Sequence, residues 1–445
     1  MKYILPVIGS ITAATLFAFA TTDSSARSVE DASHNSTFEQ LELFADVLAR
    51  VRSDYVVNVD DEELIADALN GMLQALDPHS SYVTPEEFHA LQESKSGEYG
   101  GLGMEVTSEE GVVKVVSPFD DSPADRAGIK AGDYLTAIEG ESILGLSLSD
   151  AVKQMRGKAG EPITLSVVTE GEDPREVTLV REVIKPHIVK AELKDGIGYL
   201  RLSQFNERSE ASLLDGINTL KRDAGGRLPG IILDLRNNPG GLLDQSVNIS
   251  SAFLSGGEVV SIRGRKNGDT QRFNAKTKQA VDGQTPLIIL INGASASASE
   301  IVAGAVQDRG RGLVLGMTSF GKGSVQSIIP LKGGRDGALR LTTQRYYTPS
   351  GRSIQGTGIE PDIAVSSVPE EKFKGLRFRE ADLPNSIENE DEALSDNTPD
   401  TEEEVAEIDI DYPPEDYSED DDYQLERAIE ILKDGSYAKR LAKAG

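Results

Sequence analysis

A turn rich in serine and alanine is the part of this sequence best suited to acyl-transfer chemistry. It covers residues 292–300, between an apolar run at 287–291 and a second apolar run at 301–306. The first run predicts a buried strand and the second a buried helix. A serine in the turn would therefore face unpaired backbone N–H groups at the positive end of a helix dipole, where an oxyanion is stabilised.

A serine nucleophile needs a general base, and no histidine of the sequence is suitably placed. All four histidines lie at or before residue 187, and the turn lacks the last glycine of a nucleophile elbow. Cysteine is absent, so a thiol nucleophile or thiolate metal site is excluded. Lys322 is the remaining candidate base, provided that burial lowers its pKa by about 3 from an ordinary value of about 10.4.

Two other interpretations of Lys322 remain open. A lysine in a loop is usually a solvated surface charge. The spacing from Gly316 to Gly321 and Lys322 also comes close to a phosphate-binding P-loop. However, residue 323 is glycine instead of serine or threonine, and residues 324–330 predict a strand where a P-loop requires a helix. Nucleotide binding is therefore disfavoured.

The elements around these residues predict an α/β core. Apolar runs at 198–202, 231–235 and 287–291 are separated by helical stretches. The last two runs are nearly continuously apolar, as in strands that are buried on both faces. The second of the three is followed by the glycine-bearing turn 236–241. Because sites in parallel sheets form at the carboxyl ends of strands, we expect the site at this turn and at the serine-rich turn.

A β-rich module at residues 97–185 precedes the core. Short alternating runs bounded by glycine predict its strands. Gly101-Leu102-Gly103-Met104 resembles the carboxylate-binding loop of PDZ domains, and the order of elements is similar over about 80 residues. Backbone N–H groups of such a loop can bind a terminal carboxylate, and the next strand offers an edge to a peptide. The alternative is that these glycines only form a turn.

Together, these motifs resemble the carboxy-terminal processing proteases, a family of tail-specific peptidases with a serine–lysine dyad. The resemblance rests on residues 293–300 and 320–326, on the PDZ-like module and on a closing segment at 346–362, and it covers about residues 38–366. It implies a multidomain α/β fold with a Clp-protease or crotonase-like core, residues 186–366, into which a PDZ-like domain is inserted.

The resemblance also implies roles for individual residues. Ser297 would be the nucleophile, Lys322 the general base and Gln326 the residue that orients the lysine. The N–H groups of Gly240 and Ala298 would form the oxyanion hole. No metal or organic cofactor is implied. If Lys322 and Gln326 share one strand, their separation of four residues puts both side chains on the same face.

Acidic residues are concentrated near the carboxyl end. The net charge of −29 disfavours binding to nucleic acid or to anionic lipid. Residues 380–422 hold 20 of the 74 acidic residues and no lysine or arginine. We therefore expect a disordered acidic tail at 367–422. The apolar spacing beyond it predicts a helix at 423–445 that docks on another surface.

The amino-terminal end predicts export, most simply to a periplasm. Met1-Lys2 precedes an uncharged stretch that ends in Ala18-Phe19-Ala20, as in a cleaved signal peptide. An uncleaved membrane anchor is the alternative. We expect a signal peptide at 1–20, a linker at 21–36 and a helical segment at 37–96.

These features predict an endopeptidase that captures the exposed C-terminus of a protein or peptide and then cleaves the captured chain. Arg156, at the end of a helix beside the expected peptide groove, is a candidate for coupling peptide binding to the active site. Amphipathic helices at both chain ends predict a homo-oligomer. An adaptor or activator protein is a further candidate partner.

Two other functional classes were weighed against the protease. A catalytically inactive PDZ scaffold or adaptor would not need Ser297, Lys322 and Gln326 together. A crotonase-like acyl-transferring or isomerising enzyme would not need a peptide-capture module or an export signal. The presence of the dyad and the module in one chain therefore favours the protease.

Overall fold

The computed structural model describes residues 23–109, 111–119, 121–169, 171–266, 268–372, 379–390, 409–418 and 421–444, with side chains from residue 37 onward. The signal peptide predicted at 1–20 lies outside these residues. Within them, no helix is long and apolar enough to cross a membrane. The chain divides into two units after Leu69.

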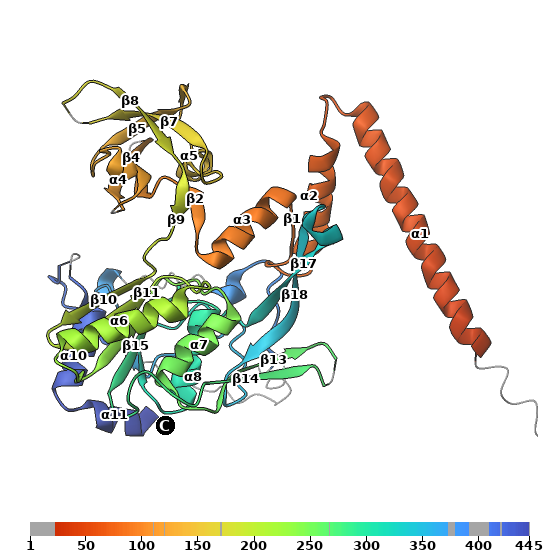
Figure 1. Ribbon diagram of the computed structural model, residues 1–445. Helices are drawn as coiled ribbons and strands as arrows, with labels where there is room; N and C mark the ends of the chain where they lie inside the picture. The colour runs from red at the N-terminus through yellow and green to blue at the C-terminus, as the bar shows by residue number, and fades with distance from the viewer. Residues whose placement is uncertain are drawn as a thin grey trace, which may run out of the picture. The chain divides into compact units, whose positions relative to one another are not determined.

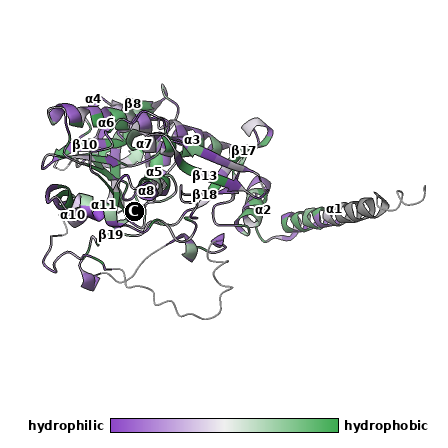
Figure 2. Cartoon of the chain, turned by 90° about the horizontal axis from the view of Figure 1, so that it is seen from below, coloured by the Kyte–Doolittle hydropathy of each residue, from purple (hydrophilic) through white to green (hydrophobic). Residues whose placement is uncertain are grey.

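The first unit contains helix α1 (Asp23–Asp54) and most of helix α2 (Asp61–Gln74). Helix α1 begins inside the segment predicted as a linker, so the helical part starts earlier than the sequence indicated. Figure 2 shows apolar colouring along the second half of α1. The large apolar side chains that are exposed there are Phe38, Leu41, Leu43, Phe44 and Val47. Such a surface is typical of a helix that binds a partner.

The core of the second unit is a six-stranded sheet (Figure 1). All neighbouring strands are parallel except the first pair, which is antiparallel. The strands predicted at 198–202, 231–235 and 287–291 are all present in it. The order across the sheet is β10 (Val189–Lys194), β11 (Ile197–Leu202), β12 (Ile231–Asp234), β15 (Leu287–Ile291), β16 (Leu313–Gly316) and β19 (Ile363–Ala364).

Helices cover both faces of this sheet. On one face, α6 (Ser209–Asp223), α7 (Leu243–Phe253) and α8 (Ala298–Asp308) pack on side chains such as Leu233 and Ile289. On the other face, α10 (Tyr423–Lys433) and α11 (Tyr437–Ala444) pack on side chains such as Ile232 and Ile288. Burial on both faces explains why β15 is apolar throughout and why β12 is apolar up to its last residue, Asp234.

The C-terminal helices are also attached by a network of charges. Asp422, the N-cap residue of α10, accepts two hydrogen bonds of 2.7 Å from the guanidinium of Arg236. Arg236 also donates to both oxygens of Asp234, a buried carboxylate at the end of β12. The segment predicted as one helix at 423–445 forms two helices, α10 and α11. The surface on which they dock is the sheet of the same chain.

Parts of the segment predicted as a disordered tail also pack on the core. Glu380 is 1% exposed, and its N–H donates to the carbonyl of Phe320 at 3.0 Å. Asp411 donates its N–H to the carbonyl of Ala364, and its carboxylate pairs with Arg427 at 2.7 Å. Composition predicts disorder here, but these carboxylates have specific partners. Residues 373–378, 391–408, 419 and 420 lie outside the described part of the chain.

A second, antiparallel sheet is built around the long strand β18 (Ala338–Tyr347). It includes β17 (Ser324–Pro330), which begins two residues after Lys322. A strand at this position rules out the P-loop, which would need a helix here. The other members are β1 (Ser81–Val83), β13 (Glu258–Gly264) and β14 (Thr270–Asn274).

The β-rich module has its own sheet and apolar core. Its main strands, in order, are β3 (Met104–Glu109), β4 (Val112–Pro118), β5 (Tyr134–Ile138), β7 (Pro162–Val168) and β8 (Arg175–Val180), with β6 (Glu141–Ser142) on β5. Helices α4 (Pro123–Arg126) and α5 (Leu148–Met155) complete it. Strands β2 (Tyr99–Gly101) and β9 (Glu182–Ile184) pair where the chain enters and leaves the module, and helix α3 (Pro85–Ser96) precedes it.

The docking of α10 leads to a prediction about stability. Ile431 is 2% exposed against the sheet, so Ile431→Ala should leave a cavity and lower the free energy of unfolding by about 2–5 kcal/mol. Urea denaturation measures this change. Ile329→Ala removes the same atoms from a side chain that is 41% exposed, and should change stability much less. Equal effects of the two variants would show that α10 does not depend on this packing.

Candidate active site

Two turns at the carboxyl ends of β12 and β15 are joined to each other, as the sequence predicted. The carbonyl oxygen of buried Asn238, in the first turn, accepts from the Ala296 N–H at 3.1 Å and from the Ser299 hydroxyl at 2.9 Å. Ser295 donates its hydroxyl to the Leu235 carbonyl at 2.8 Å. The hydroxyls of Ser295 and Ser299 are therefore occupied in holding the two turns together.

Ser297 lies directly before helix α8 and has an unusual backbone conformation. Its φ is +54° and its ψ is −111°, in a region that residues with a side chain rarely adopt. Such a conformation costs on the order of 1–3 kcal/mol and persists only where neighbouring bonds enforce it. The N–H of Ser297 donates to Oε2 of Glu300 at 2.7 Å. Burial raises the pKa of Tyr346 in β18 to about 12, and an interaction with the side chain of Ser297 acts in the opposite direction.

Glu300 connects the serine to the lysine. Its carboxylate is completely buried, and Oε2 accepts from the backbone N–H groups of both Ser297 and Lys322, the latter at 3.0 Å. Oε1 accepts from the Ser319 hydroxyl at 2.6 Å and from the Gly321 N–H at 2.7 Å. Burial raises the pKa of Glu300 to about 7, although these four hydrogen bonds act in the opposite direction.

Lys322 is half-buried in the turn that precedes β17. Burial lowers the pKa of its ammonium group below the ordinary value, which favours the neutral amine that a general base requires. Lys322 is therefore not a fully solvated surface charge. Its position also differs from the sequence argument, because Lys322 lies outside the strand that carries Gln326.

The strand register around Gln326 is irregular. The pairing of β17 with β18 shifts between Val325 and Gln326, so simple alternation from Lys322 does not apply. Instead, hydrogen bonds orient the Gln326 amide: its Nε2 donates to the Ser324 hydroxyl at 3.0 Å and to the Thr342 hydroxyl at 3.1 Å. Thr342 in turn donates to the buried carboxylate of Asp77 at 3.0 Å.

The predicted oxyanion donors, Gly240 and Ala298, lie next to each other. A Cβ atom added to Gly240 would be 2.8 Å from the Ala298 nitrogen and 2.7 Å from the Ala296 carbonyl oxygen. With a φ of +97° as well, the position requires glycine. Ala298 opens α8, where an N–H lacks a partner within the helix. The Gly240 N–H donates to Oδ1 of Asn238 at 2.9 Å in this structure.

In the β-rich module, the predicted peptide-binding residues form the turn that leads from β2 into β3. Gly103 has a φ of +73°, and its carbonyl accepts from the Ser122 hydroxyl at 2.7 Å. Leu102 is buried in the module core, and Met104 begins β3, which lies at the end of its sheet. Gly101 ends β2. The arrangement leaves one edge of β3 for an added strand.

Arg156 follows helix α5 of the same module. Its guanidinium lies 4.4 Å from the centre of the Tyr99 ring in β2, within the range of a cation–π interaction. The interaction ties the end of α5 to the strand that enters the module. The sequence placed Arg156 beside a peptide groove, and the structure adds this aromatic contact.

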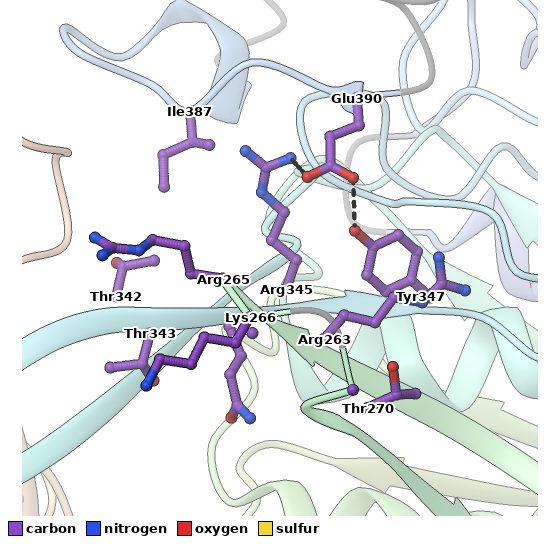
Figure 3. Close-up of a pocket in the computed structure, with 13 residues that line it drawn as sticks. Arg263, Arg265, Lys266, Thr270, Thr342, Thr343, Arg345, Tyr347, Ile387 and Glu390 are labelled. Atoms are coloured by element: carbon purple, nitrogen blue, oxygen red, sulfur yellow. Dashed lines mark hydrogen bonds and ion pairs between the residues drawn. The ribbon is translucent and has the colours of Figure 1, made fainter. Parts of the chain in front are cut away.

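A basic hollow of about 510 Å³ lies over β13 and β18 (Figure 3). Arg263, Arg265, Lys266 and Arg345 contribute its positive charge. Glu390 pairs with Arg345 at 2.6 Å and accepts from the Tyr347 hydroxyl at 3.1 Å. Among the described residues, no group of three or more His, Cys, Asp or Glu side chains forms a metal site.

Glu300 and Tyr346 were missed by the sequence argument. The spacing Ser297-x-x-Glu300 is the capping-box signal at a helix start, and it could have identified Glu300. Tyr346 lies far from Ser297 along the chain, and no local signal predicts their contact.

Comparison with known proteins gives matches to three family profiles. Peptidase family S41 matches residues 196–365, the PDZ domain matches 113–169, and the N-terminal domain of the activating protease CtpB matches 8–87. The first two matches coincide with the core sheet and with the β-rich module.

Individual relatives extend over most of the chain. A carboxy-terminal-processing protease of Bartonella bacilliformis is 50% identical over 372 residues, which are 83% of this chain and 85% of the relative. The carboxy-terminal processing protease CtpA of Bacillus subtilis is 32% identical over 364 residues, 81% of this chain and 76% of the relative. Among solved structures, the photosystem II D1 C-terminal processing protease is 29% identical, with a TM-score of 0.44, and covers 75% of this chain and 90% of its own.

The position of Glu300 leads to a prediction about the site. Glu300→Gln places an amide NH₂ where two acceptor oxygens now bind four donors, so the Ser297 and Lys322 backbones should separate. A displacement of about 1 Å costs about 100-fold in rate, and we expect kcat to fall by this factor.

Steady-state cleavage of an unfolded protein measures the effect. Glu360→Gln, at an exposed position, serves as the matched control and should leave kcat unchanged. If Glu300→Gln folded and cleaved like the parent, the buried carboxylate would not be required to assemble the site.

Proposed function

The chain belongs to the carboxy-terminal processing serine proteases of peptidase family S41 and carries a PDZ domain, and from this premise we propose that Ser297 and Lys322 are its catalytic dyad. The observation that carries the proposal is the shared acceptor: one oxygen of Glu300 binds the backbone N–H groups of both residues. Burial lowers the pKa of Lys322, which favours the neutral amine that a base needs.

In the first half of the reaction, Ser297 Oγ attacks the carbonyl carbon of the scissile peptide bond while its proton passes to neutral Lys322 Nζ. The carbonyl oxygen becomes an oxyanion near the Ala298 N–H. When the tetrahedral intermediate collapses, Lys322 returns the proton to the leaving amine and an acyl-enzyme remains. In the second half, Lys322 takes a proton from water as the water oxygen attacks the carbonyl carbon of the ester. The bond between that carbon and Ser297 Oγ then breaks, Lys322 returns the proton to Oγ, and the carboxylic acid product leaves.

We propose Ala298 and Gly240 as the oxyanion donors. The closeness of Gly240 to the Ala298 nitrogen supports this assignment. The Gly240 N–H is bound to the Asn238 side chain, so substrate must share or replace that bond. Two such donors typically contribute several kcal/mol to lowering the barrier.

Gln326 is proposed to orient Lys322. Since its Nε2 donates to Ser324 and Thr342, the carbonyl oxygen of the amide is the end that can accept from the lysine. Asp77 holds Thr342 in place and thereby fixes this orientation.

The PDZ domain binds the substrate C-terminus in this proposal. The carboxylate would bind the loop Gly101-Leu102-Gly103-Met104, and the peptide would add to the edge of β3. Protein or peptide substrates with exposed C-termini are the partners that this arrangement fits. We propose residues 97–185 as the PDZ domain and residues 186–366 as the protease core.

We also propose export and self-association. Met1-Lys2 and the uncharged stretch after it support a signal peptide at 1–20, and hence a periplasmic location. The exposed apolar side chains of α1 support a homo-oligomer in which α1 forms the interface. An adaptor that activates the protease would be an additional partner.

The dyad is tested by substitution. Ser297→Ala and Lys322→Ala should each abolish cleavage of an unfolded protein that ends in small apolar residues, because one removes the nucleophile and the other the base. The matched control is Lys332→Ala, at an exposed lysine in the turn after β17. Gel electrophoresis and mass spectrometry of the products report the result. Cleavage by either dyad variant at the parent's rate would refute the assignment.

Arg156 tests the coupling between the PDZ domain and the site. Because Arg156 links the end of α5 to Tyr99, Arg156→Ala should reduce activation by a C-terminal peptide at least about fivefold, while peptide binding is retained. Cleavage rates with and without peptide, together with calorimetric titration, measure the two quantities. Lys153→Ala, at an exposed position of the same helix, is the control. Unchanged activation in Arg156→Ala would exclude the role.

A further inference from the structure

A buried carboxylate from beyond the protease core is linked by hydrogen bonds to the turn that carries Lys322. Glu380 is 1% exposed, and its two oxygens lie 2.9 and 2.8 Å from Nε2 of His79. Oε1 also accepts from Nε2 of Gln355 at 3.1 Å. Three segments far apart in the sequence therefore meet at one carboxylate, and the dyad chemistry described above does not use it.

Glu380 is connected to both ends of the turn that carries Lys322. At one end, its N–H donates to the Phe320 carbonyl at 3.0 Å. At the other end, Gln355 accepts from the Gly323 N–H at 2.9 Å through Oε1 while it donates to Glu380 through Nε2. Because Gln355 is completely buried, these bonds have little competition from water.

Four charged groups act on the Lys322 ammonium. Glu380 contributes most among them, followed by Arg340, Glu300 and Asp77. The three carboxylates raise the lysine pKa and Arg340 lowers it, while burial lowers it most. His79 faces Glu380 from the side of residues 77–80, and Gln355 is the neutral group that completes the surroundings of the carboxylate.

We propose that Glu380 is a positioning residue of this protease, which fixes the turn of residues 320–323 through Phe320 and Gln355 and places a buried carboxylate beside that turn. The inference rests on the proposed role of Lys322 as general base. It gives a catalytic purpose to a segment that follows the region matched by the S41 profile, and it accounts for the burial of Glu380 inside the predicted tail.

The two contributions of Glu380 can be separated by substitution. Glu380→Gln keeps an oxygen that can accept from His79 or Gln355 but removes the charge. With that charge gone, the lysine pKa falls further, and the neutral amine exists at lower pH. Gln355→Ala keeps the charge but breaks the connection to Gly323.

The experiment is the pH dependence of kcat/KM for cleavage of an unfolded protein by the full chain. For Glu380→Gln, the acidic limb of the profile should move to lower pH by about one pH unit. For Gln355→Ala, kcat should fall about tenfold, while the acidic limb of the profile stays at the same pH as in the parent. Glu388→Gln removes an exposed carboxylate eight residues further on, and its profile should match that of the parent.

The outcomes separate this proposal from the dyad itself. An unmoved limb in folded Glu380→Gln, with thermal unfolding like that of the parent, overturns the role of the charge. Unchanged kcat in Gln355→Ala overturns the positioning role. If Glu380→Gln does not fold, the kcat of Gln355→Ala decides whether the positioning role stands. Activity in Ser297→Ala or Lys322→Ala would instead refute the dyad, whatever Glu380 does.

Discussion

The site depends on one shared hydrogen-bond acceptor. Oε2 of Glu300 binds the N–H groups of Ser297 and Lys322, which come from different turns, 25 positions apart in the sequence. A carboxylate with no solvent exposure is costly unless its oxygens are satisfied, and here four donors satisfy them. The same interaction holds the Ser297 backbone at its positive φ. One hydrogen bond therefore both maintains the strained backbone of Ser297 and fixes its position relative to Lys322.

The rest of the fold holds this acceptor in place. Parallel strands β12 and β15 bring the two turns to one edge, and Asn238 ties them together. The antiparallel sheet presents Tyr346, Gln326 and the lysine turn from the other side. Segments around Asp77 and Glu380 add carboxylates that act on Lys322, and His79 joins the two segments through its bond to Glu380. Under the proposed role of Lys322, surroundings that exclude water favour the neutral amine.

Much of this arrangement could be predicted from local sequence. Apolar runs predicted the strands of the core sheet, and motifs identified the PDZ domain. What could not be predicted depends on distant partners. Composition indicated a disordered tail, yet Glu380 and Asp411 pair with residues that no local rule connects to them. The shift in strand register at Gln326 likewise could not be predicted, so the expectation of simple alternation from Lys322 to Gln326 was wrong.

The most direct test of the account is the rate at which a serine-directed phosphonate labels the protein as a function of pH, with the labelled residue identified by mass spectrometry. The account predicts labelling at Ser297, with a rate that rises as a single amine with a pKa below its ordinary value loses its proton, and no such rise in Lys322→Ala. Labelling at a different serine, or a rate at Ser297 that is independent of pH and of Lys322, would contradict it.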